Sequence, residues 1–320
     1  TPLYSSAASD VYKRQIGGKL ARLDVDAARR ALAETIGKPL GLGPEQAAEA
    51  VIRIANARMA GAIRLVSIER GHDPARFTAV PFGGGGALHV GALIADVGLK
   101  SALVPRYPGI TSALGCIIAD IRHDQVMTVN LMLEGLDAAS LNARMVEAGR
   151  QAKAIVAASG LSMQRIDIVF ELDMHYQGQT HTVSAPLPAG LGEGGAPISE
   201  GTVREAFEAA YSAAFSRLLP GIPVRIVNLR TAAIGKRPAF DLMALAPKSG
   251  ASVEDARLGV RQVWFDGGWA EATIWDRLAL PVGAVVHGPA ILEQGDATTV
   301  IDPGLTARVD RFGNLIVERS

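Results

Sequence analysis

Apolar residues recur at helical spacing in the first well-patterned part of the chain. From Asp24 to Ile36 a polar start precedes apolar residues three or four positions apart, and a longer run of the same kind extends from Pro44 to Glu69. The longer run places its apolar residues along one stripe, so it predicts a long buried helix. Pro44 suits the first helical turn, and Gly71 supplies a stop after the last periodic residue.

Strand and helix patterns alternate in the stretch that follows. The segment Phe77–Phe82 (FTAVPF) predicts a short buried strand that leads directly into four glycines at 83–86. Helical spacing returns at Ala87–Val97, a second strand is expected at Ser101–Val104, and another helix is expected at Ser112–Asp120. Helices that alternate with strands are typical of α/β folds, in which helices pack on a sheet.

After Asp124 the pattern changes to longer strands and amphipathic helices. We expect strands at 126–133, 166–176, 180–186 and 224–234, helices at 136–159 and 199–218, and a Gly- and Pro-rich linker at 188–197. A weakly patterned stretch at 236–255 follows. The remainder consists of short apolar runs between turns such as DGGW, PVG and DPG, and a hairpin is expected at Asp310–Asn314.

These patterns predict an α/β domain at 16–128, followed by an α+β, strand-rich domain at 129–320. A chain of 320 residues also exceeds the usual size of one domain. Residues 1–15 (TPLYSSAASDVYKRQ) are polar and aperiodic, and they join the patterned sequence abruptly at Ile16. We interpret them as a spurious leader on a truncated reading frame; the alternative is a genuine disordered tail.

Composition and charge exclude several classes of protein. The 32 basic and 32 acidic residues cancel, and no cluster of Lys and Arg suggests a nucleic-acid surface. No apolar run approaches the roughly 20 residues that cross a bilayer, so no membrane association is expected, and no secretory signal is predicted. Cys116 is the single cysteine, which favours a reducing, cytoplasmic compartment. Because it lies in an apolar helix, we expect it to be a small buried hydrophobe.

The glycine run is the most informative local feature. Four glycines between a strand and a helix let the backbone approach a ligand closely, and the helix offers free N–H groups. The run is neither GxGxxG nor followed by GKS or GKT, so it matches neither a dinucleotide fingerprint nor a phosphate loop. A nucleotide or anion site and a tight turn with close packing remain the two interpretations.

The surrounding segments carry a more specific signal. ANARMAGAIRLVSIERGHDPARFTAVPFGGGGALHVGAL and VPRYPGITSALGCIIADIRHD closely resemble the hydantoinase A/5-oxoprolinase family, whose members include N-methylhydantoinase A-type subunits and relatives in acetone and acetophenone carboxylases. Later segments agree in order: DMHYQGQTHTV, RIVNLRTAAIGKRP, FDGGWAEATIWDR, GPAILEQGDATTVIDPG and DRFGNLIVE. The resemblance extends from about Ile16 to Glu318.

The resemblance implies part of an actin/hexokinase/Hsp70-like ATPase lobe, on its adenosine side, as the first domain. In that fold two hairpins hold the phosphates and Mg²⁺, and a later Gly-Gly turn packs on the adenosine. Phe82 to Gly86 resembles this later turn, so Gly83, Gly84 and Gly86 are expected to contact adenosine. The family usually has FGGAGPLH where this chain has FGGGGALH; Gly85 and Ala87 therefore depart from the pattern, which predicts a more flexible loop and weaker binding.

The resemblance also implies an activity, namely ATP-driven opening of a hydantoin, 5-oxoproline or another cyclic amide after phosphorylation of its carbonyl oxygen. ATP, Mg²⁺ and a B-type partner subunit in a hetero-oligomer would be required. The phosphate hairpins of the family do not occur in this sequence, so we expect a C-terminal fragment that is inactive alone, with apolar surface exposed where the rest of the lobe would pack. Alternatives are a subunit of an ATP-dependent ketone carboxylase and a non-catalytic interaction module.

Histidines supply the remaining candidates, and no metal site is expected. His89 matches the family's PLH position, where it could polarise a substrate or serve only a structural role. Arg122-His123-Asp124 could place a carboxylate on an imidazole, or could be a polar helix end. His175 and His181 could face each other only if Gly178 turns a hairpin, and two ligands are fewer than zinc usually needs.

Overall fold

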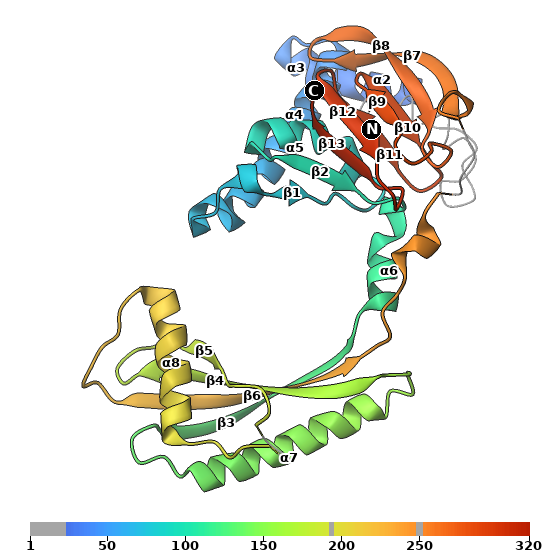
Figure 1. Ribbon diagram of the computed structural model, residues 1–320. Helices are drawn as coiled ribbons and strands as arrows, with labels where there is room; N and C mark the ends of the chain where they lie inside the picture. The colour runs from blue at the N-terminus through green and yellow to red at the C-terminus, as the bar shows by residue number, and fades with distance from the viewer. Residues whose placement is uncertain (1–23, 192–194, 248–251) are drawn as a thin grey trace. The chain divides into compact units, whose positions relative to one another are not determined.

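A computed structural model of the chain describes residues 24–191, 195–247 and 252–320, so the proposed leader at 1–15 lies outside the described residues. The chain forms two compact units (Figure 1). Unit 1 combines the residues up to Ile117 with Asp241–Ser320, and unit 2 comprises Ile118–Phe240. The expected boundary near residue 128 falls within a strand of unit 2, and the last strands of the chain pack in unit 1 instead of in a domain that begins at 129.

Two sheets form the framework of unit 1. The first has the order β1-β2-β13-β12-β9 and consists of β1 (Thr78–Ala79), β2 (Ser101–Val104), β13 (Leu315–Arg319), β12 (Leu305–Val309) and β9 (Val285–His287). The second has the order β11-β10-β8-β7 and consists of β11 (Thr298–Ile301), β10 (Ala290–Glu293), β8 (Gly268–Asp276) and β7 (Arg257–Phe265). The β1–β2 and β8–β10 pairs are parallel, and the other pairs are antiparallel.

The helices of unit 1 lie within a few residues of the predicted segments, and the start at Pro44 and the end at Val97 are as predicted. They are α2 (Val25–Leu32), the π-helix η2 (Ala33–Gly37), α3 (Lys38–Leu40), α4 (Pro44–Val66), α5 (Val90–Val97) and α6 (Thr111–Ile118). Gln46 Oε1 accepts the free N–H of Gly43 at 3.0 Å and closes the first turn of α4. After α4 and a short 3-10 turn, Gly71 adopts φ 78°, which glycine accommodates without strain.

The apolar stripe of α4 is not buried as a whole, which corrects the prediction of a fully buried helix. Its buried residues are Ala47, Ala48, Asn56 and Ala60. Val51 and Val66 are exposed, because small residues occupy the side of the helix that faces the core. Ala60, α5 and strands from both sheets share one hydrophobic cluster that includes Ile94, Val104, Leu292 and Val317.

Unit 2 is a four-stranded antiparallel sheet with two helices. Its order is β3-β6-β4-β5, formed by β3 (Ile121–Met132), β6 (Val224–Lys236), β4 (Arg165–Tyr176) and β5 (Val183–Pro186). The helices α7 (Ala138–Ala157) and α8 (Glu200–Phe215) pack with it. Alternate residues of β4, from Phe170 to Tyr176, share a core with Met145 of α7 and Phe207 of α8. Period-two burial therefore gives this unit its core.

Exposure differs from two expectations. Cys116 is exposed and not buried, and the described α6 has no buried residue. The strand expected at Phe77–Phe82 is reduced to the two residues of β1, and Phe82 is 56% exposed. Large apolar side chains are exposed in both units, including Ile54 and Leu65 in unit 1 and Ile155 and Phe215 in unit 2. None of the helices in the described ranges is long and apolar enough to cross a membrane.

Candidate functional site

The glycine run forms a sharp turn between β1 and the 3-10 helix η5 (Gly86–Leu88), which leads into α5. Gly83 has φ 79°, a conformation that side chains rarely adopt. Its N–H donates to the carbonyl oxygen of Pro108 at 2.6 Å. A Cβ added to Gly83 or Gly85 would meet nothing within 4 Å, so the backbone at these two positions borders open space.

Gly84 and Gly85 differ in what they require. A Cβ on Gly84 would lie 3.3 Å from the carbonyl oxygen of Asp296, so this residue packs tightly against the β10–β11 turn. Gly85 has φ −106°, which any residue can adopt. Gly83 therefore has a left-handed backbone conformation that favours glycine, and Gly84 has little room for a side chain. Gly85 could be replaced by a residue with a side chain.

Asp296 ties the surrounding turns together. One carboxylate oxygen accepts a hydrogen bond from the N–H of Gly109 at 3.0 Å, and the other accepts a hydrogen bond from Nε2 of Gln294 at 2.6 Å. The same Gln294 amide also donates to the carbonyl oxygen of Arg106 at 3.3 Å. Three segments distant in sequence therefore meet at the glycine turn: the turn itself, the residues after β2, and the β10–β11 turn.

His89 follows the glycine turn and precedes α5. Its Nδ1–H donates to Oδ1 of Asn56, on α4, at 2.7 Å. Burial of the imidazole lowers its pKa below the ordinary value, so the neutral ring is favoured. The ring makes no side-chain hydrogen bond that caps α5. It therefore links the two helices, and Asn56, which the sequence analysis did not single out, fixes its orientation.

His123 and Asp124 do not form the suggested pair. Both lie in β3 of unit 2 and not at a helix end, and successive residues of a strand point to opposite faces. Asp124 accepts hydrogen bonds from Arg122, at 2.7 Å from Nη2 and 2.8 Å from Nε. These bonds lower the pKa of Asp124. The carboxylate is therefore held by the arginine and not by the imidazole.

The histidine pair of the β4–β5 hairpin also stays apart. Gly178 turns the chain at φ 94°, but Met174 faces Val183, so His175 and His181 lie outside a facing pair. His175 Nδ1–H donates to the carbonyl oxygen of Tyr176 at 2.8 Å, and His181 is exposed. Within 24–191, 195–247 and 252–320, no group of three or more His, Cys, Asp or Glu side chains could hold a metal ion.

Comparison with known proteins identifies the family. Residues 12–125 match the family described as Hydantoinase/oxoprolinase, and residues 137–318 match the Hydantoinase/oxoprolinase C-terminal domain. The chain belongs to the hydantoinase/oxoprolinase family. The glycine turn, His89 and Asn56 lie within the first match, and Asp296 lies within the second. The residues around the glycine turn thus come from both matched regions of this hydantoinase/oxoprolinase chain.

Curated relatives of this hydantoinase/oxoprolinase chain include enzymes and their subunits. The caprolactamase subunit alpha of Pseudomonas jessenii is 30% identical over 92% of this chain, and the acetone carboxylase beta subunit of Xanthobacter autotrophicus is 26% identical over 89%. The 5-oxoprolinase of Saccharomyces cerevisiae is 27% identical over 88%. The matches cover 42%, 41% and 22% of these relatives, so the chain spans less than half the length of each.

Solved structures confirm the fold. The crystal structure of the ATP-dependent caprolactamase from Pseudomonas jessenii matches with a TM-score of 0.73 and 28% identity, covering 96% of this chain and 44% of that one. The nucleotide-free structure of acetone carboxylase matches with a TM-score of 0.74 over the same shares, and its 24% identity supports the fold alone. The mixed α/β architecture predicted from the resemblance is thereby confirmed.

Proposed function

We propose that this chain supplies the adenosine-binding part of an ATP-dependent enzyme that opens a cyclic amide. The observation that carries the proposal is the turn at Phe82–Gly86. Its Gly83 and Gly85 backbone borders open space, its aromatic Phe82 is exposed beside it, and the N–H of Gly83 donates to the carbonyl oxygen of Pro108 and anchors it. A flat nucleoside needs such a surface, with bare backbone for close approach and an aromatic ring nearby.

The residues present fit a nucleoside better than the whole nucleotide. In the proposed complex, Gly83, Gly84 and Gly86 contact adenosine, and the rigid β10–β11 turn prevents the loop from collapsing into the space. No group of three or more His, Cys, Asp or Glu side chains in the described ranges could hold a metal ion. In this proposal, residues of a longer protein hold Mg²⁺ and the phosphates, as the family resemblance implies. The activity therefore belongs, in this proposal, to a protein of the relatives' full length, and these 320 residues alone are inactive.

The proposed reaction follows from the chemistry of a cyclic amide. Resonance stabilises the amide bond, and bound ATP would supply a phosphoryl group to the carbonyl oxygen, with ADP as the leaving group. Water would then attack the carbonyl carbon, and cleavage of the C–N bond would open the ring to an amine. A second water at the same carbon would break the carbon–oxygen bond to the phosphate and leave a carboxylate. This chain's contribution is positioning, because phosphoryl transfer depends on holding the donor in line with its acceptor. His89 lies beside the turn with its Nδ1–H bonded to Asn56, and burial lowers its pKa, which together suit an orienting role.

Two further parts of the proposal rest on the relatives. Those named caprolactamase subunit alpha and acetone carboxylase beta subunit are subunits of larger enzymes, so we propose a hetero-oligomer with a B-type partner, in the cytoplasm, where ATP is available. A ketone carboxylase is the second candidate, because acetone and acetophenone carboxylase subunits are among the relatives. We favour the cyclic amide because caprolactamase and 5-oxoprolinase both act on that class.

Nucleotide affinity tests the assignment of the turn. In the protein at its full length, Gly84→Val should weaken binding of a non-hydrolysable ATP analogue by about tenfold or more, since the branched side chain meets the carbonyl oxygen of Asp296 and displaces the turn. Gly61→Ala, in α4 where an added Cβ meets nothing, is the matched control. Normal affinity in the Gly84 variant would refute the adenosine assignment.

Isotope transfer tests the reaction. A lactam labelled with ¹⁸O at its carbonyl should yield ¹⁸O-labelled inorganic phosphate, because the phosphorylated oxygen leaves with the phosphate. Unlabelled phosphate with normal ring opening would exclude carbonyl phosphorylation. Turnover of a ketone that requires bicarbonate, together with no turnover of lactams, would instead decide for the carboxylase.

A further inference from the structure

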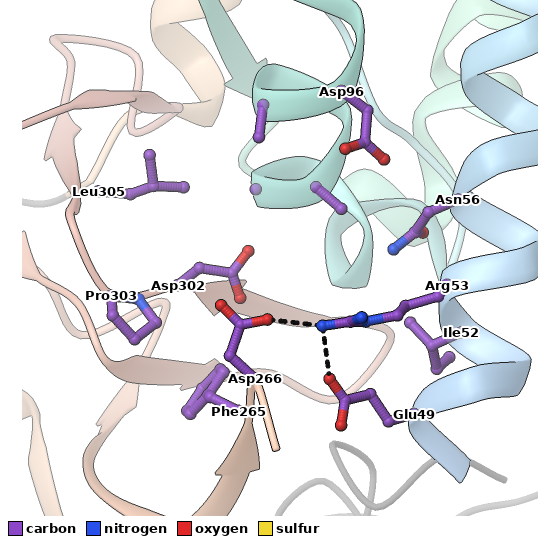
Figure 2. Close-up of a pocket in the computed structure, with 13 residues that line it drawn as sticks. Glu49, Ile52, Arg53, Asn56, Asp96, Phe265, Asp266, Asp302, Pro303 and Leu305 are labelled. Atoms are coloured by element: carbon purple, nitrogen blue, oxygen red, sulfur yellow. Dashed lines mark hydrogen bonds and ion pairs between the residues drawn. The ribbon is translucent and has the colours of Figure 1, made fainter. Parts of the chain in front are cut away.

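A cavity of about 560 Å³ lies within unit 1, away from the residues assigned to adenosine. Figure 2 shows that its walls come from α4, α5, the β7–β8 turn and the β11–β12 turn. A volume of this size is within the range of small-molecule sites. Its lining combines apolar residues with an unusual number of charges: Glu49, Arg53, Asp96, Asp266 and Asp302.

Asp302 is a half-buried charge that the described residues leave without a partner. Its side chain lies directly over the bare Cα of Gly91, where any Cβ would overlap Oδ2. Among the described residues, the carboxylate has no hydrogen-bond or ion-pair partner. Burial, and to a lesser degree the charge of Asp266, raises the pKa of Asp302 to about 6. A half-buried carboxylate without a partner is stabilised by a cation that reaches it.

Asn56 presents a donor to the same space. The residue is only 6% exposed, and its Oδ1 accepts the hydrogen bond from His89. Its amide nitrogen has no protein partner in the described part of the chain, and Figure 2 shows this nitrogen directed into the space between α4 and the Asp302 turn. Because the Asn56 oxygen is fixed by His89, the N–H₂ group is held in place for an acceptor on a ligand.

Three of the other charges of the cavity are paired with one another. Arg53 Nη2 lies 3.1 Å from Glu49 Oε1 and 2.9 Å from Asp266 Oδ1. Glu49 also accepts a hydrogen bond from Nε1–H of Trp264 at 2.8 Å. Asp96 is exposed to solvent, which hydrates its carboxylate, and only its backbone carbonyl oxygen accepts a hydrogen bond from Arg64. Asp302 and the amide of Asn56 are therefore the less exposed groups left for a ligand, one an anion and the other a donor.

We propose that this cavity binds a small organic cation, a protonated primary amine that carries a carbonyl or hydroxyl oxygen a short chain away. The ammonium group binds Asp302 and the oxygen accepts from the Asn56 amide. A metal ion is the less suitable occupant, because the described residues offer no set of three ligands and divalent cations take six or more oxygen atoms. The proposal does not rest on the adenosine assignment.

The bond between Asn56 and His89 makes binding visible at a second residue. A ligand that accepts from the Asn56 amide polarises the same side chain whose oxygen receives the His89 proton. Occupancy should therefore shift the imidazole resonances of His89, whereas an amine bound loosely on the surface would leave them unchanged.

The test uses the complete 320-residue chain and a length series of ω-amino amides: glycinamide, 3-aminopropanamide and 5-aminopentanamide, with neutral pentanamide as the matched uncharged probe. Binding is followed by calorimetric titration at about pH 8, where Asp302 is ionised. At least one amine should bind saturably and more tightly than pentanamide by about tenfold or more, since a charge-assisted bond to a half-buried carboxylate is lost in the neutral probe.

Two variants locate the site. Asp302→Asn keeps the shape of the side chain and should weaken amine binding by about tenfold or more, whereas Asp167→Asn in unit 2 should leave it unchanged. Pentanamide binding as tight as the amines, normal affinity in Asp302→Asn, or no saturable binding at about 10 mM would each overturn the proposal. Preferential binding of Ca²⁺ or Mg²⁺ would overturn it in favour of a metal site. If Asp302→Asn did not fold, the comparison of amine with neutral amide and the His89 shift would decide.

Discussion

Asp302→Asn should stabilise the protein at alkaline pH and have little effect at acidic pH. The folded-state pKa of Asp302 is raised from 3.8 to about 6, mainly by burial. Between these two values the folded state holds a proton that the unfolded state has lost, so stability falls as the pH rises from about 4 to about 6 and then levels off. Asparagine has no such proton to lose.

The magnitude follows from the size of the shift. A rise from 3.8 to about 6 is a difference of about 2 pK units, which at 1.36 kcal/mol each gives at most about 3 kcal/mol at pH 8. The partly exposed cavity reduces this value through solvent screening. The neighbouring charges, Asp266, Asp96, Glu49 and Arg53, are unchanged in the variant, so the difference between the two proteins isolates the titration of Asp302.

Urea denaturation at several pH values measures the effect. The difference in free energy of unfolding between Asp302→Asn and the unaltered chain should be near zero at about pH 4 and grow until about pH 7. A constant difference across this range would show that Asp302 does not titrate as its burial implies. A variant less stable at pH 8 would show that the carboxylate has a favourable partner, and it would also weaken the case for a cation site at Asp302.

Three further predictions concern local structure. Gly83→Ala should cost about 1–2 kcal/mol because of its positive φ, whereas Gly85→Ala should stay within about 0.5 kcal/mol; equal effects in thermal melts would contradict the turn geometry. Asp296→Ala should speed deuterium exchange at the Gly109 amide, and unchanged exchange would exclude that hydrogen bond. Phe207→Ala should cost about 3–5 kcal/mol in urea and lower exchange protection within 118–240; equal loss in unit 1 would show that the units unfold together.

Local features of the fold were predictable from the sequence, and non-local ones were not. The span of α4, the strand-to-helix position of the glycine run and the hairpin at Asp310–Asn314 follow from periodicity and turn residues, and the structure confirms them. Periodicity reports which side of an element is buried, but not which distant element covers it. The return of the last strands to unit 1 therefore had no signal in the pattern.

In the candidate site too, the local features could be predicted from the sequence and the contacts between distant segments could not. The glycines were found because glycine runs are visible in a sequence, and the family resemblance gave them a role. Asp296 lies more than 200 residues further along the chain than Gly83. Only the folded structure shows that its carboxylate bonds to Gly109, in the segment that follows β2. Asn56 is one polar residue within an apolar stripe, which is a usable signal, since a polar residue at a core position needs a partner such as His89.

The position of β13 within the first sheet has a consequence for synthesis. This strand, at Leu315–Arg319, lies between β2 and β12, and its partner β2 precedes it by more than 200 residues. On the ribosome, β2 cannot pair with β13 until that strand emerges, and by then all strands of unit 2 have already emerged and can pair. We therefore expect unit 2 to become protease-resistant before unit 1 in nascent chains.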